Sequence, residues 1–194
     1  MDIEKLTNIP IIDCGDFILR AIEIEDAEDM FEYACDDEVT EKLSWPSHAS
    51  VEATKKSIKE NFLSRPEQGM PVGYAIVIKK SNKMIGTCDF WMVSGRHNFG
   101  EIGYVINKNY WGRGITTRAL MELIKFGFDY LGLERIQIAH ATDNFASQRV
   151  IEKCDFRLEG HTRHCEKRKT GEYVDHKIYS ILKDEYLNKE LNWQ

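Results

Sequence analysis

The stretch NYWGRGITTRAL, residues 109–120, places two glycines and an arginine between a strand-like run and a helical run. It therefore predicts a strand, a glycine-rich turn and a helix in succession, and this unit is the best guide to the fold. The run before it, EIGYVIN at 101–107, is rich in β-branched and aromatic residues and is typical of a strand. From Gly114 to Leu131 the apolar residues recur at helical spacing, and Gly132 is a natural C-terminal cap. A helix that starts at this turn presents unpaired N–H groups and a partial positive charge, which suit an anion.

The glycine-rich turn can hold a diphosphate. Gly112 and Gly114 let backbone N–H groups approach a phosphate without a Cβ atom in the way. Arg113, Thr116 and Thr117 can add further donors. The turn is not a Walker loop, and the dinucleotide fingerprint GxGxxG would need a glycine at Thr117. Taken alone, the turn leaves two interpretations open: a purely structural turn and a phosphate site.

Composition and charge indicate an ordinary globular protein. The chain has 194 residues, of which 42% are hydrophobic and 30% charged, which argues against disorder. No linker or repeat divides residues 1–194, so we expect a single domain. The formal net charge is −6 and no block of lysine and arginine dominates a segment, which argues against nucleic acid and membranes as partners.

The sequence patterns also indicate a cytoplasmic protein. No apolar run approaches the roughly 20 residues that a bilayer requires, and the first residues, MDIEKLTNIPIID, lack a signal-peptide pattern. The cysteines are five in number, dispersed and without a CxxC pair, which is typical of reduced thiols.

The order of the predicted elements is that of an α/β domain with a mixed sheet and helices on both faces. We expect strands over residues 17–22, 74–80, 84–93, 101–107, 134–141, 156–166 and 173–182, and helices over 26–35, 50–63, 114–131 and 144–153.

Four segments in this order resemble the GNAT N-acetyltransferase superfamily, and more closely its branch of ribosomal-protein N-terminal acetyltransferases. They are EIGYVIN, YWGRGITTRAL, a strand that ends in ATDN, and NFASQRVIEKCDF. The family frame that binds the pyrophosphate of acetyl-coenzyme A is Arg/Gln-x-x-Gly-x-Gly/Ala. Here it is Trp111-x-x-Gly114-x-Thr116, in which Gly114 matches and the other two depart. The resemblance covers about residues 15–183, and it implies a mostly antiparallel sheet and acetyl-CoA as co-substrate.

The resemblance assigns the catalytic roles. It implies that Glu101 is the general base that takes the amine proton, often through water; the alternative is a solvated carboxylate at the start of a strand. It implies that Ser147 contacts the coenzyme A sulfur and that Asn144 bonds the pantetheine arm; the alternative is that both only cap a helix. Backbone groups of Val105 and Ile106 are expected to orient the pantetheine and polarise the carbonyl.

Other residues with reactive side chains have structural interpretations. Cys154 lies at a helical position that suits a small buried hydrophobe, and His161 with His164 makes no complete metal-ligand pattern, so we expect no metal. His140 ends a strand beside the expected opening of the sheet; we interpret it as a surface or hydrogen-bonded core histidine, and the alternative is a polar wall of the active site. Three aromatic residues are interpreted as core: Trp45, Phe90 and Trp91.

These observations and the resemblance predict an N-acetyltransferase whose acceptor is a protein N-terminal α-amine of the ribosomal-protein type. A small amine is the alternative acceptor: a polyamine, an amino sugar or an aminoglycoside. A second alternative is an acyl-CoA-binding module without catalysis. The sequence leaves the oligomeric state open between a monomer and a homodimer.

Overall fold

The computed structural model describes residues 3–168 and 170–189. Within these ranges eight strands form one sheet in the order β1-β2-β3-β4-β5-β6-β8-β7. The strands are β1 Ile12–Asp13, β2 Phe17–Ala21, β3 Tyr74–Ile78, β4 Lys83–Ser94, β5 Phe99–Ile106, β6 Arg135–Ala141, β7 Arg157–Lys167 and β8 Tyr173–Leu182. Neighbouring strands are antiparallel except β5 and β6, which are parallel. The mixed, mostly antiparallel sheet is therefore confirmed.

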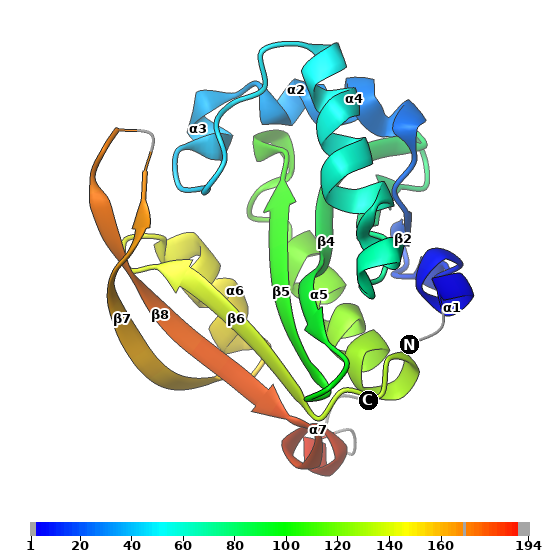
Figure 1. Ribbon diagram of the computed structural model, residues 1–194. Helices are drawn as coiled ribbons and strands as arrows, with labels where there is room; N and C mark the ends of the chain where they lie inside the picture. The colour runs from blue at the N-terminus through cyan, green and yellow to red at the C-terminus, as the bar shows by residue number, and fades with distance from the viewer. Residues whose placement is uncertain (1–2, 169, 190–194) are drawn as a thin grey trace.

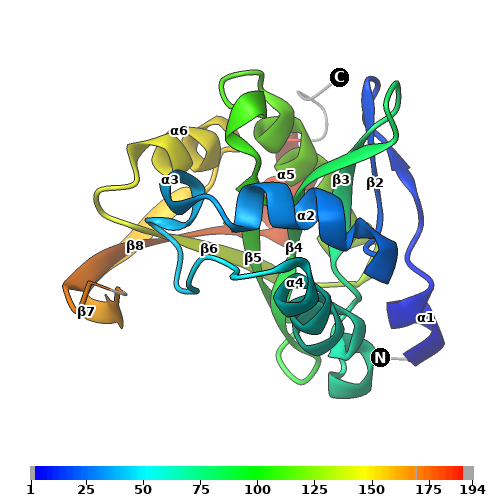
Figure 2. The same ribbon diagram turned by 90° about the horizontal axis from the view of Figure 1, so that it is seen from above.

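Helices cover both faces of the sheet, as the sequence predicts. The α-helices are α1 Ile3–Thr7, α2 Ala27–Ala34, α3 Asp37–Thr40, α4 Val51–Ile58, α5 Ile115–Lys125, α6 Phe145–Lys153 and α7 Lys183–Lys189. The shorter 3-10 and π segments are η1 Ile24–Asp26, η2 Lys59–Leu63, η3 Arg65–Gln68, η4 Lys108–Tyr110 and η5 Phe126–Tyr130. Figure 2 shows α2 and α4 on one face of the sheet and α5 and α6 on the other.

The two long predicted helices continue through a π turn. The helix expected at 50–63 consists of α4 and η2, and the helix expected at 114–131 consists of α5 and η5. Ser50 caps the first of them by accepting the N–H of Ala53 at 3.1 Å. The elements without a sequence prediction are all short, because a strand of two residues or a helix of four has no measurable period: β1 and α3 are examples.

Alternation along β4 separates the core from the site. Phe90 is 1% exposed, and its ring centroid lies 6.4 Å from that of Phe126 in η5, beneath the sheet. Its neighbour Asp89 points to the opposite face, where it meets Arg65 of η3. Burial of one aromatic side chain such as Phe90 contributes about 2–3 kcal/mol to stability, so the packing of Phe90 against Phe126 helps to hold η5 against the sheet.

In the described part of the chain, no helix has the length and apolar character needed to cross a membrane.

Candidate active site

The parallel strands β5 and β6 separate after a short paired stretch. Three residue pairs join them, from Phe99 with Arg135 to Glu101 with Gln137. Beyond that point β5 stays paired with β4 and β6 stays paired with β8. The two strands therefore open into a V in the middle of the sheet, visible between green β5 and yellow β6 in Figure 1. Backbone groups on the facing edges of the V are available to a ligand.

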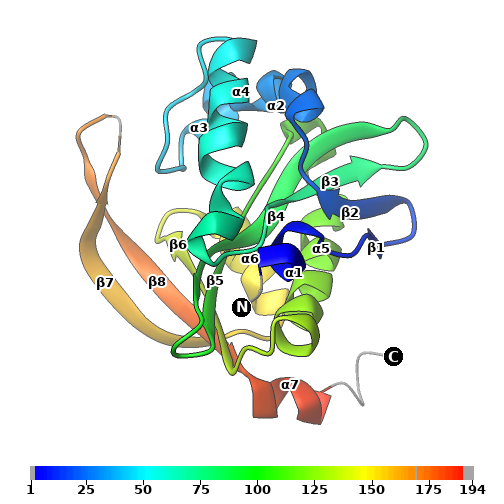
Figure 3. The same ribbon diagram turned by 45° about the vertical axis from the view of Figure 1, so that its right-hand side comes forward.

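Two clefts meet at this V. The glycine-turn cleft encloses about 650 Å³ and is lined by β5, the turn before α5, and α6. The α4 cleft encloses about 790 Å³ and is lined by α4, η2, the middle strands and the β7–β8 ladder. Figure 3 shows that ladder curving up on the far side of the V from α4. The clefts share six lining residues: Lys42, Leu43, Tyr104, Val105, Asn144 and Ser147.

The glycine turn forms one end of the glycine-turn cleft. Gly112 and Gly114 have left-handed backbone conformations, with φ of +73° and +71°. Gly114 is the N-cap of α5, and because it has no side chain, the first N–H groups of α5 are left for a ligand. Among the described residues, a Cβ atom built on either glycine would meet nothing within 4 Å. Thr116 and Thr117 line the same cleft, and this set of donors fits a diphosphate.

Two large side chains hold the turn in place. Arg113 donates to the carbonyl oxygen of Asn109 at 2.7 Å, and its guanidinium lies 5.0 Å from the ring centroid of Tyr110. Trp111 donates its indole N–H to the carbonyl oxygen of Ile106 at 2.9 Å. The residue at position 111, where the family frame has Arg or Gln, therefore ties the turn to the end of β5.

Strand geometry distinguishes Val105 from Ile106. Asn107 donates its N–H to the carbonyl oxygen of Ile85 in β4 at 2.7 Å. Because the backbone groups of successive strand residues point to opposite sides, those of Val105 also point to β4, whereas those of Ile106 point into the V. Ile106 can therefore offer an N–H to a ligand, while Val105 contributes its side chain to both clefts.

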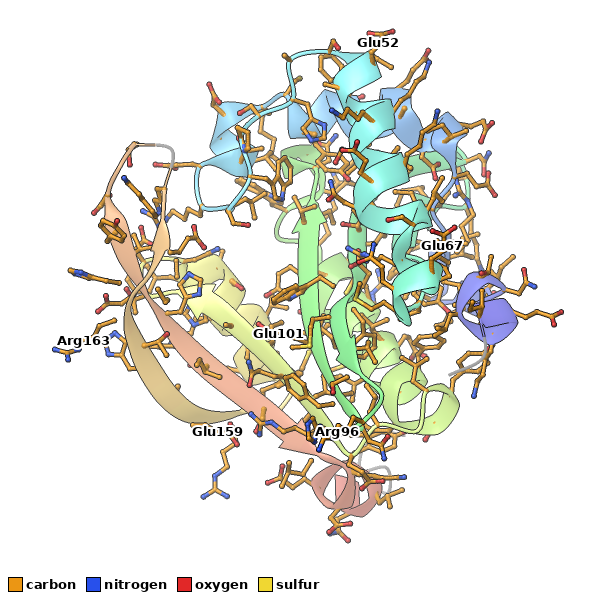
Figure 4. All side chains as sticks on the ribbon, in the orientation of Figure 1. Glu52, Glu67, Arg96, Glu101, Glu159 and Arg163 are labelled. Atoms are coloured by element: carbon orange, nitrogen blue, oxygen red, sulfur yellow. The ribbon has the colours of Figure 1, made fainter. Side chains whose placement is uncertain are left out.

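Glu101 lies where β5 and β6 begin to separate. Its half-buried side chain lines the α4 cleft, and Gln137 donates from Nε2 to its Oε2 at 3.1 Å. Burial raises the pKa of the Glu101 carboxyl, and the hydrogen bond from Gln137 and the positive charge of Arg135 oppose that rise. Figure 4 shows Glu101 beside β5 on the side that faces β6. A carboxylate with a raised pKa beside an open cleft is suited to accept a proton.

Ser147 and Asn144 lie at the start of α6, on the other face of the sheet. Asn144 caps the helix, because its Oδ1 accepts the Ser147 N–H at 3.1 Å. The Ser147 hydroxyl lies 2.7 Å from the hydroxyl of Tyr104 in β5. Burial raises the pKa of Tyr104, so this phenol stays protonated. Glu101 and Ser147 therefore approach the V from opposite faces of the sheet.

Three features of the site have no counterpart in the sequence predictions. Tyr104 is the partner of Ser147. An ion pair of 2.5 Å between Arg65 and Asp89 lines the α4 cleft, with side chains 9% and 7% exposed. Lys42, which lines both clefts, donates to the carbonyl oxygen of Asp143 at 2.9 Å. The last two contacts join positions far apart in the chain, and a single sequence contains no pattern that pairs them.

The structural interpretations of Cys154 and His140 are confirmed. Cys154 is buried, and burial raises the pKa of its thiol to about 12, which removes it as a nucleophile. His140 is buried, with Nδ1 2.7 Å from the carbonyl oxygen of Ala141, and it also lines the α4 cleft, as the alternative of a polar wall requires. Among residues 3–168 and 170–189, no three side chains of the kinds that bind metals come together. Phe90 is core, but the same prediction for Trp91 is wrong, because Trp91 is 49% exposed beside the α4 cleft.

Comparisons with known proteins agree with this geometry. The acetyltransferase (GNAT) domain model matches residues 16–157. The uncharacterized N-acetyltransferase p20 of Bacillus licheniformis is 34% identical over 87% of this chain and 93% of its own length. The ribosomal-protein-serine acetyltransferase of Escherichia coli is 27% identical over 86% of this chain and 92% of its own. The solved structure of ribosomal L7/L12 α-N-protein acetyltransferase RimL in complex with coenzyme A has a TM-score of 0.81 at 26% identity, covering 91% of this chain and 99% of that one.

The family match spans most of the chain, including β5, the glycine turn, α5, β6 and α6. These are the segments on which the sequence resemblance rests, and the V between β5 and β6 lies among them. The resemblance is therefore confirmed, and the chain belongs to the GNAT acetyltransferase family.

Proposed function

We propose that this protein acetylates the N-terminal α-amine of a protein substrate, of the ribosomal-protein type. The chain is an acetyl-CoA-dependent N-acetyltransferase. Its acceptor is the part that we propose. The similarity to the ribosomal-protein-serine acetyltransferase and to RimL supports a protein α-amine.

One observation carries the proposal: the two clefts lie on opposite faces of the sheet and share residues at the V. Acetyl-CoA fits the glycine-turn cleft, with its diphosphate at Gly112–Thr117 and its pantetheine arm beside Asn144 and the edge of β5. The thioester then lies at the V. The acceptor amine enters from the α4 cleft and reaches the thioester from the other face, where Glu101 lies.

Each residue at the V has one task in this arrangement. An α-amine has a pKa near 8, so it is mostly protonated at neutral pH and must lose a proton before it attacks. Glu101 takes that proton, directly or through water, because burial has raised its pKa toward the operating range. The N–H of Ile106 donates to the carbonyl oxygen as negative charge develops there. Ser147 meets the departing sulfur.

The α4 cleft suits a cationic acceptor that arrives with a chain attached. Its lysine and its arginine are already paired, Lys42 with Asp143 and Arg65 with Asp89. The carboxylate of Glu101 has an amide as its hydrogen-bond partner, so it leaves a net negative charge in the cleft. The exposed indole of Trp91 provides an apolar wall for the first side chains of a peptide.

A small cationic amine is the second candidate acceptor. A further carboxylate in the α4 cleft favours it, since Glu166 lines the cleft with Oε2 3.1 Å from the imidazole of His176. A polyamine could place one amine at Glu101 and a second near Glu166, whereas an N-terminal peptide has one such amine at its end.

Thiol release from acetyl-CoA tests the proposal. The purified protein is given peptides with Ala, Ser or Met at the N-terminus, and separately spermidine, glucosamine and an aminoglycoside. We expect release with free N-terminal peptides and none with the same peptides after N-terminal blocking. Release with spermidine but with no peptide would replace the protein acceptor by a polyamine. Binding of coenzyme A without release on any amine would favour a non-catalytic module.

A further inference from the structure

We propose that Tyr104 is a positioning residue that aims the Ser147 hydroxyl at the departing sulfur of acetyl-CoA. The inference rests on the proposed function, in which Ser147 meets that sulfur. It assigns to β5 a task on each face of the sheet: Glu101 handles the amine on one face, and Tyr104 organises the thiol end on the other.

The contact between Tyr104 and Ser147 is the observation that carries this inference. The two hydroxyl oxygens are 2.7 Å apart, and the Tyr104 hydroxyl is also 3.3 Å from the Ser147 carbonyl oxygen. Both residues line both clefts, so their contact lies where the clefts meet. Both residues are partly buried, Tyr104 in strand β5 and Ser147 in the first turn of α6. Tyr104 packs against the hydrophobic core, so its hydroxyl has a fixed place from which to hold that of Ser147.

The direction of the hydrogen bond decides what Ser147 can do. When Tyr104 donates to the Ser147 oxygen, the Ser147 proton is free to point toward the sulfur. When Ser147 instead donates to the Tyr104 oxygen, its proton is not available to the sulfur. The partly buried phenol keeps its proton. Its nearer acceptor is the Ser147 hydroxyl at 2.7 Å, with the Ser147 carbonyl oxygen at 3.3 Å, so Tyr104 can donate to the Ser147 hydroxyl throughout the reaction. As negative charge grows on sulfur, the first direction becomes favoured, because it aligns two O–H groups toward the charge.

The reaction balances without a proton leaving Tyr104 or Ser147. The α-ammonium group gives one proton to Glu101 before attack, and Glu101 passes it on to solvent. The neutral nitrogen then forms the new bond to the acetyl carbon, and its second proton leaves by the same route as the tetrahedral intermediate collapses. The C–S bond breaks, and its electron pair stays on sulfur as a thiolate that accepts the Ser147 hydrogen bond. A thiol has a pKa near 8.5, so the released thiolate takes its proton from solvent. Tyr104 strengthens the hydrogen bond that Ser147 gives, because hydrogen bonds in a chain polarise one another.

A structural role for Tyr104 makes a different prediction. If the phenol only packs α6 against β5, its hydroxyl acts on the position of the helix, and its loss should matter whether or not Ser147 has a hydroxyl. If Tyr104 acts through Ser147, its hydroxyl should matter only when the Ser147 hydroxyl is present. A double-mutant cycle separates these cases.

The experiment measures kcat and KM for acetyl-CoA in the wild type, Tyr104→Phe, Ser147→Ala and the double variant. We expect Tyr104→Phe to lower kcat about tenfold, because the variant loses the hydrogen bond to Ser147 and thereby weakens the hydrogen bond from Ser147 to the sulfur, with KM changed less than about twofold. In the Ser147→Ala background the same change should alter kcat less than about twofold. Equal losses in both backgrounds would overturn the inference, and so would a Ser147→Ala variant with wild-type kcat.

A control and a second measurement keep the result interpretable. Tyr130→Phe removes a hydroxyl that lies 3.3 Å from the Lys5 carbonyl oxygen, in η5 and outside both clefts, and should leave kcat unchanged. Coenzyme A should bind more tightly than desulfo-coenzyme A at pH 9, where more of the thiol is ionised than at pH 7, and Tyr104→Phe should reduce that preference to the Ser147→Ala value. An unchanged preference would overturn the inference. A wild type that releases no thiol with any amine would instead overturn the proposed function itself.

Discussion

The two ends of the active site are built in different ways. In the proposed arrangement, the coenzyme end consists of consecutive residues, the turn 110–117 with the start of α5, and its donors are mainly backbone groups. The acceptor end gathers side chains from β4, β5, β6, η3 and the β7–β8 ladder. A backbone site tolerates changes of side chain, which explains how Trp111 and Thr116 can depart from the family frame. A side-chain site depends on tertiary packing, so we expect substitutions in it to act mainly by lowering the stability of the folded protein.

The ion pair of Asp89 with Arg65 gives the largest expected effect on stability. Arg65 is always protonated, so Asp89→Asn would leave a buried guanidinium without its carboxylate. Breaking a buried pair in this way costs about 3 kcal/mol or somewhat more. The free energy of unfolding, measured in urea, should fall by about that amount, while the affinity of the remaining folded protein for coenzyme A stays within about twofold.

The matched control is an exposed pair of the same kind. Arg118 lies 2.6 Å from Asp16, and their side chains are 44% and 65% exposed. Exposed pairs contribute at most about 1 kcal/mol, so Asp16→Asn should change stability much less than Asp89→Asn. Equal losses from the two variants would mean that the acceptor end does not depend on its buried pair.

Glu101→Gln tests the acceptor end through chemistry instead of packing. We expect kcat to fall about 100-fold, the lower range for loss of a general base, with the dissociation constant of coenzyme A unchanged.

The same variant has a consequence for stability. Because burial raises the pKa of Glu101, the folded state binds this proton more tightly than the unfolded state, and the ionisation of Glu101 lowers stability as pH rises through the raised pKa. The Gln variant should therefore be no less stable than the wild type at pH 7. Glu134→Gln, which removes a carboxylate paired with Lys183 outside both clefts, should leave kcat intact.

The pH profile sharpens the same prediction. Glu101 must be ionised to accept a proton, so kcat/KM of the wild type should rise with pH through its raised pKa. This acid limb should lie above the usual range of a glutamate, near 4.3, because burial disfavours the carboxylate. The limb should be absent from the profile of Glu101→Gln. If the acid limb of kcat/KM lay at the same pH in the wild type and in Glu101→Gln, the limb would belong to a titratable group other than Glu101.

The same contrast explains how much the sequence could predict. The strands and long helices were predictable because alternation and helical period are local, and the glycine turn could be recognised because its donors are adjacent in the chain. The contacts of Asp89 with Arg65 and of Lys42 with Asp143 depend on how distant segments pack. Tyr104 is an intermediate case. Strand alternation places it on the face opposite Glu101, but its partner Ser147 is known only once α6 is placed.

Gly114→Ala tests the coenzyme end. Alanine in a left-handed conformation costs about 1 kcal/mol, and its Cβ would enter the space above the turn that a phosphate needs. We expect the dissociation constant of coenzyme A to rise about tenfold, while kcat at saturating acetyl-CoA changes little. Gly132→Ala is the control, because Gly132 has φ of +70° and is equally open but lies outside both clefts. It should lose similar stability and keep its affinity; a loss of affinity in both variants would show that strain alone is responsible.

The smallest effect is expected for Arg113→Ala, which separates the side-chain share of the coenzyme end from its backbone share. Arg113 is exposed and bonds the Asn109 carbonyl oxygen, so it must give up that contact to reach a phosphate. Its net contribution should be at most about 1 kcal/mol, or about a threefold change in the dissociation constant of coenzyme A, and salt should reduce it. Arg96→Ala, in the turn between β4 and β5, is the control of equal charge and should change nothing (Figure 4). If Arg113→Ala weakened coenzyme A binding more than Gly114→Ala, the coenzyme end would also bind mainly through side chains. The two ends of the active site would then not differ in the kind of group that binds.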